Sequence, residues 1–379
     1  MTQPIATTTP PGPSSLSGLL ATAGLVGRGG AGFSTARKLD AAIGTRADLI
    51  VNACDGEIGA AKDAWTVEHR LPELVAGAHL VAAATGGTIR YAAHRGSATA
   101  QRLAAAGLDV LAVPHRYVSS EESALVSLAH GGLAKPMTTR VPFVYGGRDR
   151  RDAKVAPTLV LNAETVGLIA QLAARGADGP AWLTSVGTPD EPGPRLVTVT
   201  GYVERPGVVQ TAAGAALTQV LDLAGGLPAD AQTVVVGGLG GIVLDADTAR
   251  EVTWSRAGLA PYGGSTGAGV VAVLDPRQCP LDVVNGFVAY GAGESAGQCG
   301  PCMFGLPAIA EDFDRLTRGA AGAQEFDRLR RRLGQLPGRG ACHHPDGVAR
   351  FAGSALSALA PHVREHLQGG CTKERVTHE

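Results

Sequence analysis

Short apolar segments alternate with segments of helical pattern between residues 46 and 176, and this alternation limits the folds open to the chain. Such alternation is typical of an α/β sheet. Aromatic residues make up only 4% of the chain while 53 residues are glycine, which favours close packing of helices on the sheet. Strands are expected at 49–53, 88–95 and 108–114, helices at 71–87, 97–107 and 119–132, and a strand, turn and helix at 157–176. The helix at 119–132 is expected to have Ser119 or Ser120 as its N-cap.

The alternation of strand-like and helix-like segments changes near residue 190. A β-hairpin, a helix and a Gly-Gly pair are expected over 195–227, further strands over 233–247 and a last strand over 270–278, whereas the chain from about 281 onward has helical pattern. G-Y-V-E-R-P-G (201–207) and L-A-G-G-L (223–227) resemble the ubiquitin-like SLBB domain. The expected domains are a disordered tail at 1–15, an α/β domain at 16–190, an SLBB-like α+β domain at 191–280, a helical bundle at 281–370 and a tail at 371–379.

Charge and hydropathy exclude several classes of partner. The net charge is −1, which does not favour binding to nucleic acid or to an anionic membrane surface. The chain holds no apolar run of the roughly 18 residues that span a bilayer. Its first residues are rich in Pro, Ser and Thr and lack the pattern of a signal peptide. A cytoplasmic protein without direct membrane insertion is therefore expected.

The stretch G-R-G-G-A-G-F-S-T-A-R-K (27–38) formally satisfies the dinucleotide-binding pattern G-x-G-x-x-G. That pattern requires a preceding strand, and residues 16–26 have helical spacing, so a Rossmann turn is rejected. Four glycines in this stretch still permit positive φ angles and leave backbone N–H groups uncovered. Such a loop can approach a flat ring or phosphates, with Arg28 and Lys38 supplying positive charge. The alternative is a tight turn between two helices.

Six cysteines, at positions 54, 279, 299, 302, 342 and 371, suggest metal or redox chemistry more than disulfides. Cys299-Gly-Pro-Cys302, together with the distant Cys342, is the group to consider. By themselves these residues favour a structural zinc site, in which a C-x₂-C pair joins a further Cys and His. Cys279 and Cys371 are expected to take no part.

Six motifs occur in a fixed order along the chain: G-R-G-G-A-G-F (27–33), V-N-A-C-D-G-E-I-G-A-A-K-D (51–63), R-Y-V-S-S-E-E-S-A-L (116–125), P-T-L-V-L-N-A-E-T (157–165), E-S-A-G-Q-C-G-P-C (294–302) and G-A-C-H-H-P-D-G-V-A (340–349). Together they resemble the NADH-oxidising flavoprotein subunit of respiratory complex I and its relatives in NAD-linked hydrogenases and formate dehydrogenases. The resemblance covers about residues 16–370 and implies a non-Rossmann α/β domain that binds FMN and NADH.

The resemblance assigns roles to particular residues. Glu57 and Glu122 are the candidates for the reaction. Glu57 would face the bound nicotinamide nucleotide, and Glu122 would lie with Glu121 in the flavin and nucleotide cleft. Phe33 would pack against the nicotinamide end of NADH. The paired Glu121 and Glu122 could instead be surface acids that complement a helix dipole. The cofactor-binding residues implied are Gly27, Arg28, Gly29, Gly30, Gly32, Phe33, Lys38, Asn52, Asp55, Tyr117, Glu121, Asn162 and Thr165.

Several positions depart from the family's pattern. Cys54 and Asp55 differ from the usual N-A-D-E-G-E-P-G, and Cys54 replaces a carboxylate close to the flavin. Ser120 replaces a glycine, and Leu161 replaces an asparagine. Ala41 stands where many relatives carry an aromatic residue that stacks on adenine. These departures imply a changed flavin affinity or potential. They also imply either weaker NADH binding or a changed nucleotide preference.

The family's E-S-C-G-Q-C-T-P-C supplies three thiolates to a [4Fe–4S] cluster, and a distant cysteine supplies the fourth. Here Ala296 replaces the first thiolate, while Cys299, Cys302 and Cys342 remain as metal ligands. The cluster is expected to be [4Fe–4S] with a non-thiolate ligand, for which His343 and His344 are the candidates, or [3Fe–4S]. Loss of the cluster is the third outcome.

The reaction implied is hydride transfer from nicotinamide C4 to flavin N5, followed by single-electron transfer to the cluster. A ferredoxin or a thioredoxin-like [2Fe–2S] subunit would then accept the electrons. A weaker resemblance is to the Rnf electron-transfer subunit, although its C-x₂-C-x₂-C-x₃-C-P runs are missing here. The alternative function, which is not enzymatic, is that of a degenerate subunit that only docks partners.

Overall fold

The computed structural model describes residues 13–138, 141–149 and 152–373. The expected tails therefore lie largely outside the described residues. By contact the chain divides into two compact units, each built from separated segments. The first unit comprises residues 1–54, 63–112 and 139–194, and the second comprises 55–62, 113–138 and 195–379. The domain limits expected from the sequence stay a prediction.

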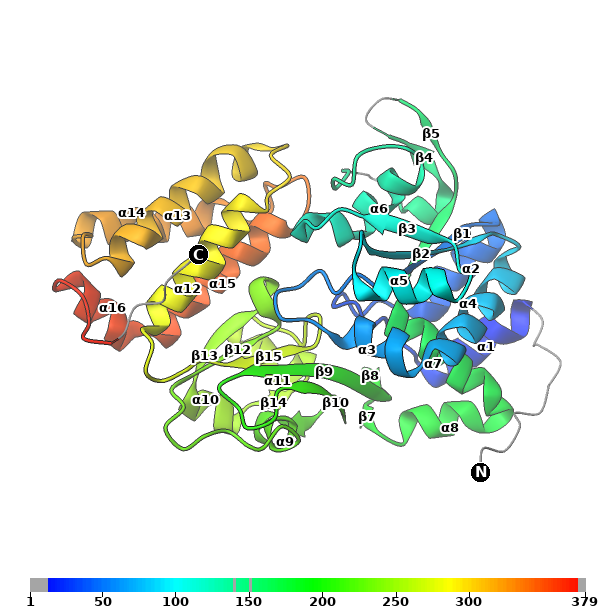
Figure 1. Ribbon diagram of the computed structural model, residues 1–379, viewed down its shortest axis with the longest axis horizontal. Helices are drawn as coiled ribbons and strands as arrows, with labels where there is room; N and C mark the ends of the chain where they lie inside the picture. Colours follow the sequence, from blue (N-terminus) through cyan, green and yellow to red (C-terminus); the bar gives the residue numbers. More distant parts are fainter. Residues whose placement is uncertain (1–12, 139–140, 150–151, 374–379) are drawn as a thin grey trace. The chain divides into compact units, whose positions relative to one another are not determined.

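The first unit is built on a four-stranded sheet of order β3-β2-β1-β6. The central strand β1 (Asp48–Asn52) is parallel to both neighbours, with Leu49 opposite Ile89 and Leu159. Its residues 49–51 are buried, as is typical of a parallel strand covered on both faces. The bounds, which Figure 1 allows the reader to follow, are α1 Pro13–Ala23, α2 Thr35–Thr45, α3 Lys62–His69, α4 Leu71–Thr85, β2 Ile89–His94, α5 Ala98–Ala105, β3 Val110–Val113, β4 Gly147–Arg148, β5 Lys154–Val155, β6 Thr158–Asn162, α7 Ala163–Ala174, α8 Gly179–Thr184, β7 Gly187–Thr188 and β8 Glu191–Pro192.

Two helices of this unit, α4 and α7, approach each other closely because α4 presents a glycine to its neighbour. A Cβ atom on Gly77 would lie only 2.0 Å from the carbonyl oxygen of Val166. The small residues noted in the sequence therefore permit this contact. The helix α1 precedes the glycine stretch, which confirms that no strand stands there.

The second unit contains a five-stranded sheet of order β10-β9-β15-β12-β13. β9 and β15 are parallel, while β12 pairs antiparallel with β15 and β13. Trp254 is fully buried in the core beside this sheet. The bounds are α6 Glu122–Ala129, β9 Pro194–Gly201, β10 Gly207–Ala212, β11 Ala215–Ala216, α9 Leu217–Asp222, β12 Thr233–Val236, β13 Ile242–Asp245, α10 Ala246–Glu251, β14 Thr253–Trp254, α11 Arg256–Leu259 and β15 Val270–Val273.

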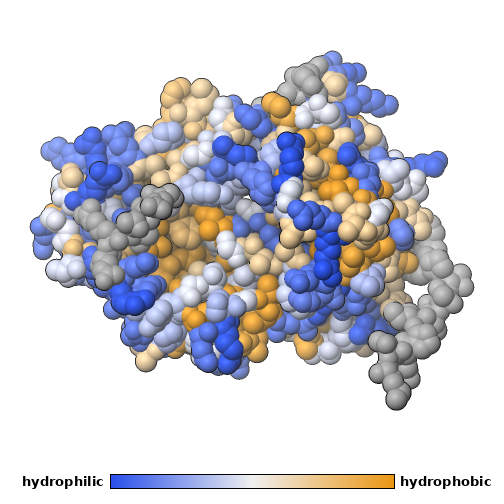
Figure 2. Space-filling model, viewed as in Figure 1, coloured by the Kyte–Doolittle hydropathy of each residue, from blue (hydrophilic) through white to orange (hydrophobic). Residues whose placement is uncertain are grey.

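The rest of the second unit is helical, as expected from residue 281 onward. Phe313, Leu329 and Phe351 are fully buried in its core. α13 and α14 are joined by Asp312, whose side chain is 1% exposed and pairs with two arginines of α14. Figure 2 shows hydrophilic residues gathered over the arginine-rich α14. The bounds are α12 Pro280–Gly293, a π-helical turn Pro301–Gly305, α13 Leu306–Thr317, α14 Ala323–Gln335, α15 His344–Ala358 and α16 Ala360–Leu367.

One local expectation was wrong. The N-cap of α6 is Glu121, not Ser119 or Ser120, because residues 117–120 form a 3₁₀ turn that ends just before it. The Glu121 carboxylate accepts hydrogen bonds from the N–H groups of Ser123 and Ala124. Within the described residues, no helix is both long enough and apolar enough to cross a membrane.

Candidate functional site

The glycine stretch forms a closed loop immediately before α2 in the first unit. Gly27 N–H donates to Phe33 O at 2.9 Å, so the chain returns on itself. Gly30 and Gly32 have φ angles of 104° and 61°, which residues with a side chain rarely adopt. Among the described residues, the N–H groups of Gly29, Gly30 and Gly32 have no hydrogen-bond partner. The loop therefore offers unpaired donors, as a site for an anionic or carbonyl-bearing group requires.

Arg28, in the same loop, is only 2% exposed. Its backbone N–H donates to Thr165 Oγ1 at 2.9 Å. Its guanidinium donates to the carbonyl oxygens of Pro192 and Pro194, at 2.6 and 3.3 Å. These contacts fix the loop to α7 and to the 192–194 segment.

Asn52 and Asn162 end two adjacent parallel strands and lie opposite each other in register. The carboxyl ends of such strands are where α/β sheets bind ligands. Asn162 Nδ2 donates to Asp63 Oδ2 at 2.8 Å, and a Cβ on Gly29 would lie 3.5 Å from Asn162 Cβ. The loop thus contacts Asn162 at the end of β6. Asp63, 5% exposed, was missed by sequence reasoning, although it closes the second motif.

Other predicted residues of the first unit lie on or beside α2. Lys38 Nζ donates to Val160 O at 3.5 Å. The Phe33 side chain is 47% exposed, and the Arg37 guanidinium lies 5.5 Å from its ring centroid. Ala41 lines a shallow surface hollow together with Arg37.

The departures at 54, 55 and 120 have different surroundings. Cys54 is buried, and its N–H donates to Asn52 Oδ1 at 3.2 Å. Asp55 has a φ angle of 46°, which aspartate tolerates better than most residues. In the second unit, a Cβ on Gly56 would lie 1.9 Å from Ser120 Oγ. Position 56 must therefore stay glycine while Ser120 is present.

Glu57, in the second unit, has both carboxylate oxygens hydrogen-bonded. Oε2 accepts from Tyr117 Oη at 2.7 Å and from Gly240 N–H at 3.4 Å. Oε1 accepts from Leu239 N–H at 2.7 Å and from Ile58 N–H at 2.9 Å. Burial raises the pKa of Glu57 above its ordinary value, and these hydrogen bonds partly oppose the rise. The structure therefore holds Glu57 in one orientation.

Tyr117 joins three motifs of the sequence. Its hydroxyl reaches Glu57, and its N–H donates to Glu294 Oε2 at 2.7 Å. Glu294 also pairs with Arg116 at 3.1 Å. The Tyr117 ring packs near His344, with centroids 5.2 Å apart. Predicted site residues from four separate segments are therefore brought together.

The paired acids Glu121 and Glu122 differ in their surroundings. Glu121 is the N-cap of α6, so its carboxylate completes the first turn of that helix. Glu122 is the first residue of α6 and is half-buried. Glu121 thus acts on the start of α6, and the nucleotide-binding roles expected for Glu121 and Glu122 stay predictions.

The three predicted cluster cysteines lie in one neighbourhood of the second unit. The Cys299 and Cys302 thiols hydrogen-bond to each other, and Cys342 lies close enough to affect the pKa of Cys302. Burial raises the pKa of Cys302 to about 12. Of the described residues, these three do not form a set with all sulfurs within 4.8 Å of one another.

The position of the missing thiolate is filled by Ala296, which is 6% exposed and whose N–H donates to the Cys302 sulfur. His343 is fully exposed and lies 3.4 Å from Asp346. His344 is buried, and its Nε2 lies 2.7 Å from Gly291 O. His344 Nδ1 has no hydrogen-bond partner among the described residues.

The residues present fit both groups that the sequence implies. In the first unit, unpaired backbone donors at the end of the sheet suit the polar edge and phosphate of a flavin nucleotide. In the second unit, three thiols of the right chemistry suit an iron–sulfur cluster with one position left to another ligand.

Comparison with known proteins identifies the chain. Family models match at residues 20–171 (Nuo51 FMN-binding domain), 196–243 (SLBB domain) and 282–366 (NADH-ubiquinone oxidoreductase-F iron-sulfur binding region). The chain belongs to the family of NADH-oxidising flavoprotein subunits of complex I. It is an oxidoreductase with an FMN-binding domain, an SLBB domain and an iron–sulfur binding region, which confirms the fold class and the cofactors expected.

Relatives of this family are similar along most of the chain. An NADH-quinone oxidoreductase subunit of Rhizobium meliloti is 26% identical over 94% of this chain and 89% of its own. The NADP-reducing hydrogenase subunit HndC of Solidesulfovibrio fructosivorans is 28% identical over 84% of this chain and 69% of its own. The crystal structure of an air-oxidized NAD⁺-reducing [NiFe]-hydrogenase matches with a TM-score of 0.81 and 29% identity. That match covers 94% of this chain but only 63% of the hydrogenase chain, so this chain spans less than two thirds of it.

Proposed function

We propose that this chain oxidises NADH or NADPH and passes the electrons through FMN and an iron–sulfur cluster to a partner protein. The observation that carries the proposal is the gathering of Cys299, Cys302 and Cys342 in a chain that also has an FMN-binding domain. A scaffold that only docks partners has no need for three neighbouring thiols. FMN, when bound, supplies the conversion between hydride and single-electron transfer.

The protein's own groups would bind the flavin nucleotide and orient the nicotinamide nucleotide. The unpaired N–H groups of the glycine loop would hydrogen-bond the flavin nucleotide, with Asn162 beside them. Glu57, fixed by Tyr117 and three backbone donors, would orient the nicotinamide nucleotide. No side chain needs to act as a general base, because a hydride carries its own electron pair.

The relatives in NADH-quinone oxidoreductases and hydrogenases are subunits of larger assemblies, which supports a partner that accepts electrons. We propose a ferredoxin or a thioredoxin-like [2Fe–2S] subunit. Met303 and Phe304 directly follow Cys302 and are 53% and 72% exposed, so they offer apolar contact beside a cluster ligand. Phe304→Ala is expected to slow electron transfer to the partner while NADH still reduces the flavin at the wild-type rate. An unchanged transfer rate would remove this surface from the proposal.

Anaerobic purification, followed by flavin, iron and acid-labile sulfide assays, tests the core of the proposal. We expect bound FMN, iron and sulfide, with flavin bleaching on addition of NADH or NADPH. Glu57→Gln should bleach more slowly at equal FMN content, whereas the surface variant Glu311→Ala should match wild type. A colourless protein that cannot be reconstituted would identify the docking subunit instead.

Two substitutions test the ligand assignment. Cys299→Ser should lower iron and sulfide while FMN stays bound. Ala296→Cys restores the family's first thiolate, and it should raise the ratio of iron to protein if wild type holds [3Fe–4S]. If wild type holds [4Fe–4S], we propose His344 as the fourth ligand, because of the two candidates it is the buried one and its Nδ1 has no partner among the described residues. His344→Ala should then change the electron paramagnetic resonance spectrum and His343→Ala should not.

A further inference from the structure

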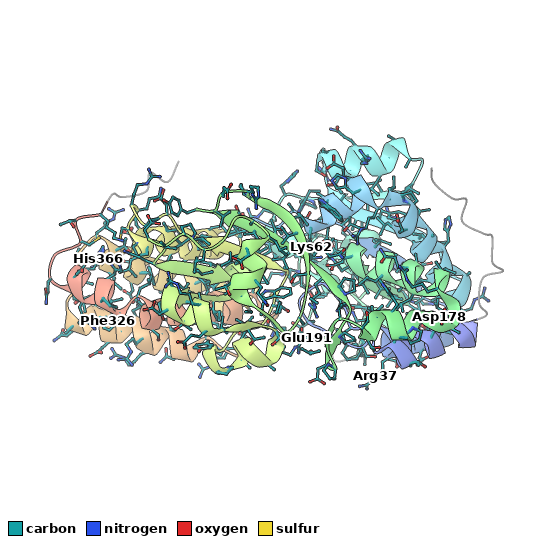
Figure 3. All side chains as sticks on the ribbon, turned by 90° about the horizontal axis from the view of Figure 1, so that it is seen from below. Arg37, Lys62, Asp178, Glu191, Phe326 and His366 are labelled. Carbon is teal, nitrogen blue, oxygen red and sulfur yellow. The ribbon has the colours of Figure 1, made fainter. Side chains whose placement is uncertain are left out.

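A second group of metal-ligating side chains lies in the helical part of the second unit. Cys279, His366 and Cys371 place their ligand atoms within 4.8 Å of one another. Cys279 Sγ lies 3.3 Å from His366 Nε2. Cys279 and His366 are 1% and 2% exposed, and Figure 3 labels His366 near the end of the chain. None of these residues belongs to the three-cysteine group described above.

The elements of the fold explain why these residues meet. Cys279 immediately precedes α12, and His366 lies in the last turn of α16. Cys371 lies in the segment that follows α16, where it packs against the core of the helical part. His362 lies one turn before His366, and residues four apart share a face of a helix.

A fourth ligand is available beside this group. His362, Glu365 and Cys371 also place their ligand atoms within 4.8 Å of one another, and Cys371 belongs to both sets. The sequence H-x₃-H-x₄-C from 362 to 371, with the distant Cys279, provides two imidazoles and two thiols. That donor set and that His spacing are typical of structural zinc sites.

We propose that Cys279, His362, His366 and Cys371 bind one Zn²⁺ ion in a closed, structural site. Zn–S and Zn–N bonds of about 2.3 and 2.0 Å place tetrahedral S and N ligands about 3.5 Å apart. The 3.3 Å between Cys279 Sγ and His366 Nε2 is close to that separation. Both thiols are deprotonated on binding, and two protons are released to solvent.

The ion would join the start of α12 to the end of the bundle. No other metal group is needed for this site, and it does not depend on the proposed electron-transfer function. A disulfide between Cys279 and Cys371 would use the same thiols but would leave both histidines without a metal.

Zinc content of the as-isolated full chain, measured by mass spectrometry of the elements, tests the proposal. We expect one zinc per chain in addition to iron. Cys279→Ser, His366→Ala and Cys371→Ser should each lower zinc at least tenfold while iron and sulfide stay at wild-type levels. His69→Ala, an exposed histidine of the first unit, is the control and should keep its zinc.

Separate variants of His362 and Glu365 show which of the two is the fourth zinc ligand. His362→Ala should lower zinc retention during dialysis against a chelator severalfold, whereas Glu365→Ala should not. The opposite result would overturn the ligand assigned to the fourth position.

X-ray absorption at the zinc edge is measured on the wild-type protein, so its result does not depend on whether a variant folds. The expected zinc shell contains two sulfur and two nitrogen ligands. A shell of three sulfurs would place zinc on Cys299, Cys302 and Cys342 and would overturn the proposal. A zinc-free protein, with free thiols or with a disulfide between Cys279 and Cys371 in peptides mapped without reductant, would overturn it too.

Discussion

Replacing Tyr117 by phenylalanine removes only the hydroxyl that donates to Glu57 Oε2 at 2.7 Å. After the change, that oxygen keeps only the Gly240 N–H at 3.4 Å, while Oε1 keeps both of its backbone donors. A hydrogen bond contributes about 1 kcal/mol when both groups are neutral and about 1.5–3 kcal/mol when the acceptor is charged. The difference is about 1 kcal/mol or somewhat more, and losing it raises the pKa of Glu57 further.

The sign of the pH dependence follows from this shift. The pKa of Glu57 is already raised in the folded protein above its ordinary value of 4.5, so the folded state holds the proton more tightly than the unfolded chain. The free energy of unfolding therefore falls as the pH rises above the unfolded pKa, until the folded carboxyl has ionised. In Tyr117→Phe the free energy of unfolding continues to fall up to a higher pH, because the folded carboxyl ionises later. Its destabilisation should be about 1 kcal/mol near pH 4 and about 2–3 kcal/mol near pH 8.

Urea unfolding followed by circular dichroism at several pH values measures this difference. Tyr290→Phe is a matched control, because that ring packs edge-on against Tyr117 with centroids 6.3 Å apart, while its hydroxyl is not among the described donors to Glu57. In a Glu57→Gln background the pH-dependent part of the Tyr117→Phe effect should disappear. An equal loss at every pH, or a pH-dependent loss that persists without the carboxylate, would refute the reasoning.

Two further pairs of variants test packing and charge by thermal unfolding. Gly77→Ala should destabilise by about 1–3 kcal/mol, because its Cβ would lie 2.0 Å from Val166 O. Gly167→Ala, in α7 with nothing within 4 Å of the new atom, should instead stabilise by about 0.5–1 kcal/mol, and a loss there would contradict the argument. Asp312→Ala should cost about 2–3 kcal/mol, because its buried carboxylate pairs with two half-exposed arginines of α14 at 2.6 and 2.5 Å. Glu311→Ala, which breaks an exposed pair on the same helix, should stay within about 0.5 kcal/mol of wild type, and equal losses in the two variants would show that burial does not matter there.

Local patterns predicted the elements of this fold well. The apolar run at 49–53 is strand β1, and the Gly-Gly pair after 71–85 ends α4 with Gly86 in the left-handed conformation. Such signals act over a few residues, so they can be read without a structure. The cap of α6 was assigned to the wrong residue because serine is the usual N-cap, whereas here the helix begins after an intervening 3₁₀ turn.

Contacts between residues that lie far apart in the sequence could not be predicted from the sequence. Asp63 meets Asn162 across 99 positions, and Cys279 meets His366 across 87. No spacing rule connects such residues, because only the fold brings them together. The burial of Arg28 is of the same kind, since two of its guanidinium partners, Pro192 O and Pro194 O, lie more than 160 positions away.

Tyr117 is held at both ends, by Glu57 through its hydroxyl and by Glu294 through its backbone, and the latter partner lies 177 positions further along the chain. During synthesis the tyrosine therefore leaves the ribosome long before its second partner exists. At about 5–20 residues per second, the delay is roughly 10–35 seconds. For that time the segments 55–62 and 113–138 exist without the part of the second unit that contains Glu294, so this contact of Tyr117 can form only late in translation.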